Sequence, residues 1–262
     1  MNREYKESGY FVVRHLFTEE ELRELAKAVL EFHGSWKCKN SEFYSKKAVN
    51  SAYITGTEHL GESKRNVLFK FIGSSRLMKV VSDVIPERPA FMNTQLFFNP
   101  VNADQKNYWH RDSQYHMTAE EQQEALSGPN VVHFRIPLAN EPGIELVPGT
   151  HKRWDTDEEL DVRLENNGHK NYEDISTGVR IKLEVGDLLV FSANMIHRGL
   201  YGMDRLSLDI IFCDTEPSLI KFASDDCLPG HEVLRDIEDP SAFLNTINLK
   251  TNNNAIHATG LQ

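Results

Sequence analysis

The run DLLVFSAN at 187–194 and the run RLSLDIIF at 205–212 decide the fold. Both are short and rich in β-branched and large apolar residues, which is typical of β-strands bounded by turns. Similar runs recur from residue 90 onward, namely FMNTQLFFN at 91–99, NYWHRD at 107–112, VVHFRIPL at 131–138, IELVP at 144–148 and GVRIKLEV at 178–185. Short strands at this spacing predict a β-sandwich or barrel rather than a fold of alternating strands and helices.

Helical signals flank and interrupt this β-rich region. Residues 18–33 begin with a capping box of Thr18 and Glu21 and continue with apolar residues at helical spacing, so they predict an amphipathic helix after a strand at 9–17. Further helices are expected at about 63–85, at 118–128 and near 230–246. We therefore expect a single domain over 1–262, with N-terminal helices in 1–89, a β core in 90–213 and a C-terminal extension in 214–262.

The charge balance excludes some partners. Lysine and arginine number 29 and aspartate and glutamate 39 among 262 residues, which gives a net charge of −10. This disfavours nucleic acid and membrane surfaces as partners, because both require a basic binding face. The three cysteines form no CxxC pair, which disfavours a disulfide framework or a cysteine zinc site. The start of the chain lacks an apolar segment behind basic residues, so we expect no signal peptide and a cytoplasmic protein, either a monomer or a homodimer.

The sharpest local motif is Tyr108-Trp109-His110-Arg111-Asp112. If this segment is an extended strand, its side chains alternate, and His110 and Asp112 point to the same side. An imidazole and a carboxylate on one face can chelate a single metal ion. The pair is weak by itself, because a histidine and an aspartate at this spacing are more often an ordinary surface pair.

Two features further along the chain strengthen the motif. His197 lies just beyond the run 187–194, where it is either a third metal ligand or a histidine packed at a strand end. In the run 205–212, apolar residues alternate with Arg205 and Ser207, so that a guanidinium and a hydroxyl project together from the opposite face. Such a pair can bind a carboxylate, and the alternative is an arginine that pairs with a surface acid.

Together, two histidines and one carboxylate can form the facial triad of non-haem iron sites, which leaves three metal positions open. A 2-oxo acid can occupy two of these positions, and O₂ can occupy the third. The distal carboxylate of 2-oxoglutarate then needs a cationic anchor, and Arg205 can provide it on the strand that follows His197. The combined pattern indicates an Fe(II) enzyme with 2-oxoglutarate and O₂ as cosubstrates.

The order of HxD, distal histidine and arginine resembles that of the Fe(II)/2-oxoglutarate-dependent oxygenases, and within them the phytanoyl-CoA dioxygenase family. Four stretches carry the resemblance: GYFVVRHLFTEEEL at 9–22, YWHRDSQYH at 108–116, IELVPGTHKRW at 144–154 and VGDLLVFSANMIHRG at 185–199. The resemblance covers about residues 9–213. It implies a mainly β fold with flanking helices around a double-stranded β-helix, the jelly roll also found in cupins.

By this resemblance, His110, Asp112 and His197 are the iron ligands and Arg205 binds 2-oxoglutarate. Ser207 fits the RxS variant of related oxygenases, and Gln95 is our candidate for a further cosubstrate contact on the strand that also carries Asn93 and Asn99. The implied reaction is hydroxylation or a related oxidation of a small molecule, with release of succinate and CO₂. Halogenating relatives have Gly or Ala in place of the carboxylate ligand, so the aspartate here implies oxidation without halogenation.

The candidate substrate contacts are His116 on the expected rim of the site, Arg135 in the run 131–138, and Arg198 beside the distal ligand. With Gln114 and Tyr115, they favour a small polar or anionic metabolite or a natural-product intermediate. The acidic run at 155–161 is expected to be a solvated face or a lid.

Two interpretations from other classes stay open. The first is a zinc-dependent hydrolase on the same His110, Asp112 and His197 triad. The second is a non-catalytic cupin-like protein that binds metal. The retained Arg205 argues against the second interpretation, because a protein without turnover has no need of an anchor for a 2-oxo acid.

Overall fold

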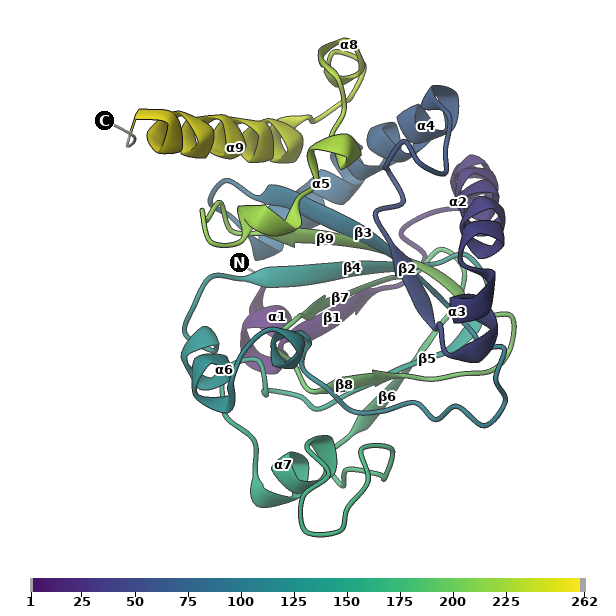
Figure 1. The fold of residues 1–262 in the computed structure, drawn as a ribbon, viewed down its shortest axis with the longest axis vertical. Coiled ribbons are helices and arrows are strands. Elements are labelled where there is room, and N and C mark those ends of the chain that lie inside the picture. Colours follow the sequence, from purple (N-terminus) through teal and green to yellow (C-terminus); the bar gives the residue numbers. More distant parts are fainter. Residues whose placement is uncertain (1, 260–262) are drawn as a thin grey trace.

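Two antiparallel β-sheets face each other in the computed structural model, which describes residues 2–259 and their side chains up to residue 252 (Figure 1). The larger sheet has the order β1-β7-β4-β9-β3-β2, with β1 at Tyr10–Val13, β7 at Leu188–Ser192, β4 at Val131–Pro137, β9 at Leu206–Cys213, β3 at Ala90–Phe98 and β2 at Asn50–Ala52. The smaller sheet has the order β6-β5-β8, with β6 at Val179–Leu183, β5 at Glu141–Leu146 and β8 at His197–Gly199. The predicted mainly β jelly roll with flanking helices is confirmed.

Strand alternation gives the larger sheet two different faces. On β9, Leu208, Ile210 and Phe212 belong to the main hydrophobic core, and Ser207 and Asp209 are buried on the opposite face. The same alternation on β4 separates core residues from cavity residues. The outer face of the sheet therefore packs against helices, and the inner face carries polar side chains toward the smaller sheet.

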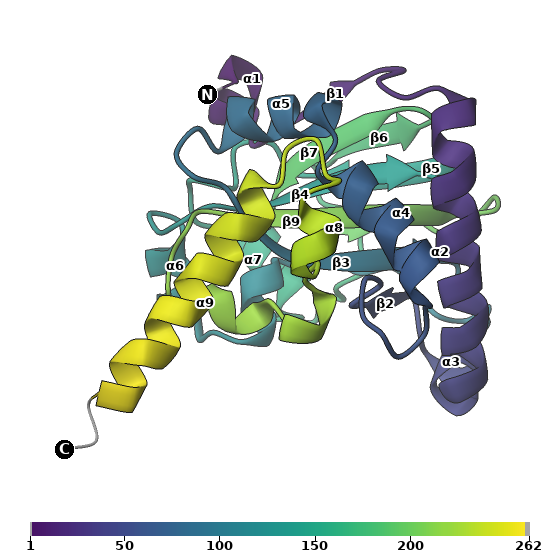
Figure 2. The ribbon, with the colours of Figure 1, turned by 90° about the horizontal axis from the view of Figure 1, so that it is seen from above.

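Helices cover the outer face of the larger sheet (Figure 2). They are α2 at Glu19–Lys39, α4 at Glu62–Ile72, α5 at Ser75–Val84 and α9 at Ser241–Thr259; the short helices α1 at Arg3–Ser8, α3 at Ser41–Lys46 and α8 at His231–Leu234 accompany them. The predicted capping box is present, since the Glu21 amide donates to Thr18 Oγ1 over 3.2 Å and the Thr18 amide donates to Glu21 Oε2 over 2.8 Å. None of the helices described has the length and apolarity needed to cross a membrane.

Short helical segments interrupt the connections near the open end of the sandwich. They are the 3₁₀ turn η1 at Asp112–Tyr115, α6 at Ala119–Ala125, α7 at Asp157–Arg163, and the 3₁₀ turns η2 at Ile220–Phe222 and η3 at Asp225–Cys227. Helix α6 confirms the helical insert expected at 118–128, with Thr118 as its N-cap.

The prediction of a strand at 107–112 is wrong. His110 forms only an isolated antiparallel bridge with His197, and Asp112 begins the turn η1. This segment is therefore a loop that contacts the end of the smaller sheet, and its side-chain directions come from that contact rather than from strand alternation.

His33, the buried histidine of α2, is expected to make the stability of the protein depend on pH under acid conditions. His33 packs against Phe98 and Tyr44, and burial lowers its pKa to about 4. The unfolded chain therefore binds more protons than the folded chain between pH 6.5 and 4, so this residue makes stability fall as the pH falls through that range. We expect the urea midpoint of His33→Leu to depend less on pH in this window than that of the wild type. An equal dependence in both proteins would contradict the assignment.

Candidate metal centre

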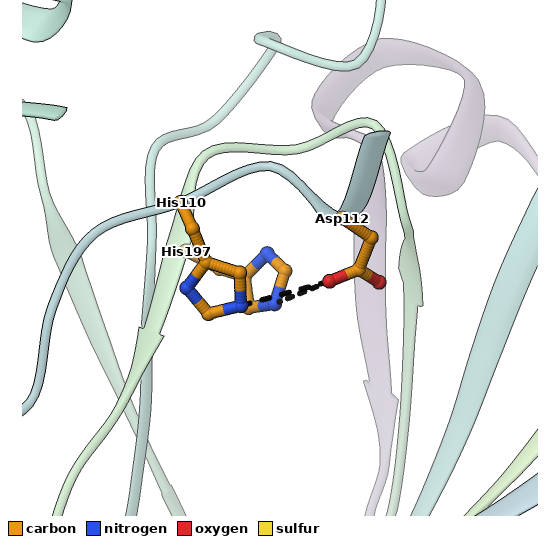
Figure 3. A group of neighbouring side chains, drawn as sticks. All are labelled: His110, Asp112 and His197. Atoms are coloured by element: carbon orange, nitrogen blue, oxygen red, sulfur yellow. Dashed lines mark ion pairs between the residues drawn. The ribbon is translucent and has the colours of Figure 1, made fainter. Parts of the chain in front are cut away.

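Three side chains converge between the two sheets (Figure 3). The ligand atoms offered by His110, Asp112 and His197 all lie within 4.8 Å of one another. Asp112 Oδ1 lies 3.6 Å from the Nε2 atom of each histidine. The three residues that were predicted from the sequence to share a metal site therefore lie together, although the strand predicted to carry His110 and Asp112 is a loop.

Backbone hydrogen bonds create this convergence. The amides of His110 and His197 each donate to the carbonyl of the other residue over 2.9 Å. The Asp112 amide donates over 3.2 Å to the carbonyl of Ala193, just beyond β7. The loop that carries the first two ligands is thus held against the segment that carries the third.

Each histidine is oriented by its second ring nitrogen. His110 Nδ1 lies 3.1 Å from the Tyr108 carbonyl oxygen, and His197 Nδ1 lies 3.0 Å from the Met195 carbonyl oxygen. A carbonyl only accepts, so both Nδ1 atoms carry the proton and donate. The Nε2 atoms, which face Asp112, are left with free lone pairs, as metal-binding imidazoles require.

The protonation states also fit a divalent metal ion. Burial lowers the pKa of His197 to about 3 and also lowers the pKa of His110. Burial by itself would raise the pKa of Asp112, but the neighbouring imidazoles, that of His133 foremost, hold it well below its usual range. Two neutral imidazoles and one carboxylate therefore face each other at neutral pH, and this donor set suits iron in the facial arrangement with open positions.

Arg111, the residue between two of the ligands, fixes their loop. Its side chain is fully buried and donates to Asp155 from Nε over 3.0 Å and from Nη2 over 2.7 Å. It also donates to the carbonyl oxygens of Thr150, Asn194 and Arg153. One guanidinium thus ties the loop of His110 and Asp112 to two other segments of the chain, residues 150–155 and the turn at Asn194.

The acidic run at 155–161 is not a solvated face or a lid throughout, which corrects that expectation. Asp155 is fully buried between Arg111 and Arg163. Glu159, on α7, has a fully buried side chain that pairs with Arg153. Within this run, these two acids have internal roles, because they neutralise the arginines that brace the metal-binding loop.

A cavity of about 920 Å³ opens beside the triad. One end is cationic: Arg135 and Arg205 line it, and both guanidinium groups lie over the Phe97 ring, at 4.5 and 5.5 Å from its centroid. The opposite end is apolar, with side chains that line the cavity from β3, β4, β9 and the segment around η2: Met92, Val131, Ile211, Leu219 and Phe222. We call these the cationic end and the apolar end.

Strand register places the triad between the two ends. Arg135 pairs with Asp209, and His133, two residues earlier on β4, pairs with Ile211. Val131, a further two residues back, pairs with Cys213. Since His133 contacts Asp112, the ligands lie at the middle level of this ladder.

Arg205 is buried, and no hydrogen-bond partner for its Nε is found in the described part of the chain. Glu141 Oε2 lies 3.4 Å from this nitrogen, and burial lowers the pKa of the guanidinium to about 10. Gly199 makes room for the group, because a Cβ at that position would lie 2.5 Å from Arg205 Nη2. The arginine is thus held at the cationic end with donors available to a ligand.

The other predicted site residues fall into two groups. Gln95 and His116 line the cavity, and the ring of His116 lies 5.6 Å from that of Phe222. Ser207 is fully buried beside this cavity wall, and its Oγ has no partner among the residues described. Arg135 lines the cavity but holds Asp209 through two hydrogen bonds, which leaves its Nη1 as the buried donor without a described partner.

Arg198 does not line the cavity, so its predicted contact with substrate is not supported. Its guanidinium pairs with Glu145 and Asp174 and lies over the Trp109 ring. Gln114 is also engaged elsewhere, since its side-chain oxygen accepts from Arg163 and from the Arg111 amide. Both side chains contact residues in or beside the loop that carries His110 and Asp112, namely Arg111 and Arg163 for Gln114 and Trp109 for Arg198.

Sequence reasoning missed Asp209, Glu141 and Gly199. Asp209 follows Ser207 at the next alternating position of β9, so its inward direction was available from the pattern. The roles of Glu141 and Gly199 depend on their distances from Arg205, which no sequence pattern indicates.

Comparisons with known proteins bear on the family and the fold of the chain. The family model described as phytanoyl-CoA dioxygenase (PhyH) matches residues 5–200. None of the curated proteins compared with the chain matches it. The fold is similar to EctD from S. alaskensis, crystallised with 2-oxoglutarate and 5-hydroxyectoine, at 14% identity and a TM-score of 0.59 over 81% of this chain and 74% of that chain.

Two further solved structures share the fold. AviO1 from Streptomyces viridochromogenes Tue57 has 16% identity and a TM-score of 0.57 over 80% of this chain and 92% of its own. SnoK, a non-haem α-ketoglutarate-dependent carbocyclase from nogalamycin biosynthesis, has 13% identity and a TM-score of 0.52 over 82% and 83% of the two chains.

The buried contacts of Arg111 lead us to expect that its substitution lowers the stability of the protein strongly. Arg111→Met would remove five hydrogen bonds and leave the Asp155 carboxylate buried with Arg163 alone. We expect the free energy of unfolding in urea to fall by about 3–5 kcal/mol, as for the loss of one partner from a buried pair. Arg3→Met, which removes an exposed pair with Glu7, is the matched control and should change it by less than about 0.5 kcal/mol. Similar losses in the two variants would contradict the bracing role.

Proposed function

The chain belongs to the phytanoyl-CoA dioxygenase family, and from this premise we propose that it is an Fe(II)- and 2-oxoglutarate-dependent dioxygenase whose metal ligands are His110, Asp112 and His197. The observation that carries the proposal is the convergence of these three donors in the middle of a cavity whose far end is cationic. Bound iron, with 2-oxoglutarate and O₂, supplies the oxidation of a substrate C–H bond and the conversion of 2-oxoglutarate to succinate and CO₂.

The protein's contribution begins with ligand geometry. The carbonyls of Tyr108 and Met195 hold the two imidazoles so that Nε2 faces the metal position. The Arg111 brace fixes the loop that carries His110 and Asp112. Because these contacts are made within the protein itself, little reorganisation is needed when a metal binds.

Arg205 binds the distal carboxylate of 2-oxoglutarate at the cationic end. It directly precedes β9, two residues before Ser207, whose buried hydroxyl adds a second donor. Gln95 contributes a further polar contact from β3. Burial strengthens these interactions, because a charge-assisted hydrogen bond gains from exclusion of water.

The substrate occupies the apolar end and presents a C–H bond to the metal position. The aliphatic and aromatic side chains there exclude water from the reacting group. The mouth is polar, with His116, Glu121 and Lys221 among its residues. We therefore propose a small molecule with an apolar portion inside the cavity and its polar groups at the mouth, and hydroxylation or a related oxidation of the apolar portion. This revises the expectation of a polar metabolite, because Gln114 and Arg198 are bound to other residues of the protein and are not available to a substrate.

The triad assignment predicts loss of both metal binding and turnover. His110→Ala and Asp112→Ala each remove one of three protein ligands, so we expect no Fe(II)-dependent succinate release and much weaker binding of Co(II), with circular dichroism unchanged. His169→Ala is the control, because this half-exposed histidine pairs with Glu173 away from the cavity. Undiminished decarboxylation of 2-oxoglutarate by either metal-loaded triad variant would contradict the assignment of the metal ligands.

The cosubstrate anchor predicts a change in the 2-oxoglutarate requirement. Arg205→Ala removes the cation, and Gly199→Ala adds a methyl group where the guanidinium now lies. We expect each to raise the concentration of 2-oxoglutarate needed for half-maximal succinate release at least about tenfold, because a charge-assisted hydrogen bond contributes about 1.5–3 kcal/mol. Arg180→Ala, at a largely exposed arginine of β6, should leave the titration unchanged. An unchanged titration in Arg205→Ala would remove this residue from the site.

A further inference from the structure

We propose that His133 is a positioning residue for the metal centre: it holds Asp112 so that one carboxylate oxygen faces the metal position, and Asp209 and Arg135 hold His133 in turn. The inference rests on the metal site proposed above and assigns a role to three buried residues outside it. Asp112, His133, Asp209 and Arg135 form a continuous chain of contacts from the metal position to the cationic end, and the last three are buried.

The contacts on either side of the His133 ring define the first part of this chain. Nε2 lies 2.7 Å from Asp112 Oδ2, and Nδ1 lies 3.0 Å from Asp209 Oδ2. A carboxylate only accepts hydrogen bonds, so both ring nitrogens donate and the ring is an imidazolium.

The second part of the chain fixes Asp209. Arg135 donates from Nε to Asp209 Oδ1 over 2.7 Å and from Nη2 to Oδ2 over 3.0 Å. The His133 ring is also stacked on Phe191, with centroids 4.7 Å apart and an interplanar angle of 17°. Because His133, Arg135 and Asp209 are each at most 3% exposed, the ring cannot exchange its carboxylate partners for water.

These contacts give the two carboxylate oxygens of Asp112 different roles. Oδ2 is occupied by His133, and Oδ1 is the atom that lies 3.6 Å from both ligand histidines. The aspartate would therefore hold a metal ion through Oδ1, while Oδ2 stays bound to His133. Without His133, the carboxylate could rotate and Oδ2 would lose its buried donor.

The test compares metal affinities of folded variants. His133→Leu removes both donors and leaves the Asp209–Arg135 pair intact. Co(II) titration followed by visible absorption should give a dissociation constant about 10–100-fold higher than in the wild type, the usual effect of removing a residue that orients a metal ligand. His33→Leu is the matched control: this buried histidine lies on α2 in the helical layer, so its affinity and Co(II) spectrum should equal those of the wild type.

A merely structural role would lower the thermal midpoint of the metal-free protein and leave the Co(II) affinity and spectrum of the folded fraction unchanged, and that result would overturn the proposal. If His133→Leu does not fold, the Co(II) affinity of Asp209→Asn is measured instead. This substitution keeps the shape of the side chain and weakens its hydrogen bond to His133. A weaker affinity than the wild type supports the proposal, and an equal affinity overturns it. A wild-type chain that binds no Co(II) would overturn the metal centre itself, and this inference with it.

Discussion

Burial of charge inside the sandwich is the constraint on which the rest of the structure depends. Two arginines and one imidazolium line the inner face of the larger sheet, and the carboxyl groups of Asp112, Asp209 and Glu141 lie beside them. An isolated buried charge costs several kcal/mol, so these groups are tolerable only as matched pairs. A divalent metal ion would add two positive charges to this balanced set, and the dianion 2-oxoglutarate would remove the excess. The interior is therefore electrostatically suited to binding both together.

The same constraint explains the polar insert at 154–176. The loop between His110 and Asp112 is too short to carry its own secondary structure, and Arg111 fixes it from inside the protein. A buried guanidinium needs carboxylate and carbonyl partners, and Asp155 with its neighbours supplies them. Asp155, which looks in the sequence like part of a solvated acidic surface, is thus required by an arginine that lies between two of the proposed metal ligands.

Sequence alternation predicted what strands determine and missed what tertiary contacts determine. Along β9 and at Arg205, which directly precedes it, the pattern correctly separated Leu208 and Ile210 from Arg205 and Ser207, because alternation is a property of the strand itself. The segment at 107–112 has strand-like residues, yet its conformation comes from a bridge to His197 and from Arg111, and neither is encoded locally. The link between His133 and Asp209 depends on the register of β4 against β9, which requires the assembled sheet.

The order of residues along β4 gives the cavity its direction. Arg135, His133 and Val131 follow one another on the inner face, and they correspond to the cationic end, the metal level and the apolar end. A molecule that binds Arg205 by its carboxylate reaches the metal position from one side, and a molecule in the apolar end reaches it from the other. The two can therefore be bound at once without competing for side chains. Because His133 joins Asp112 to Asp209 and Arg135, the residue that lies between the two ends of the cavity is also the one that holds the carboxylate proposed to bind the metal.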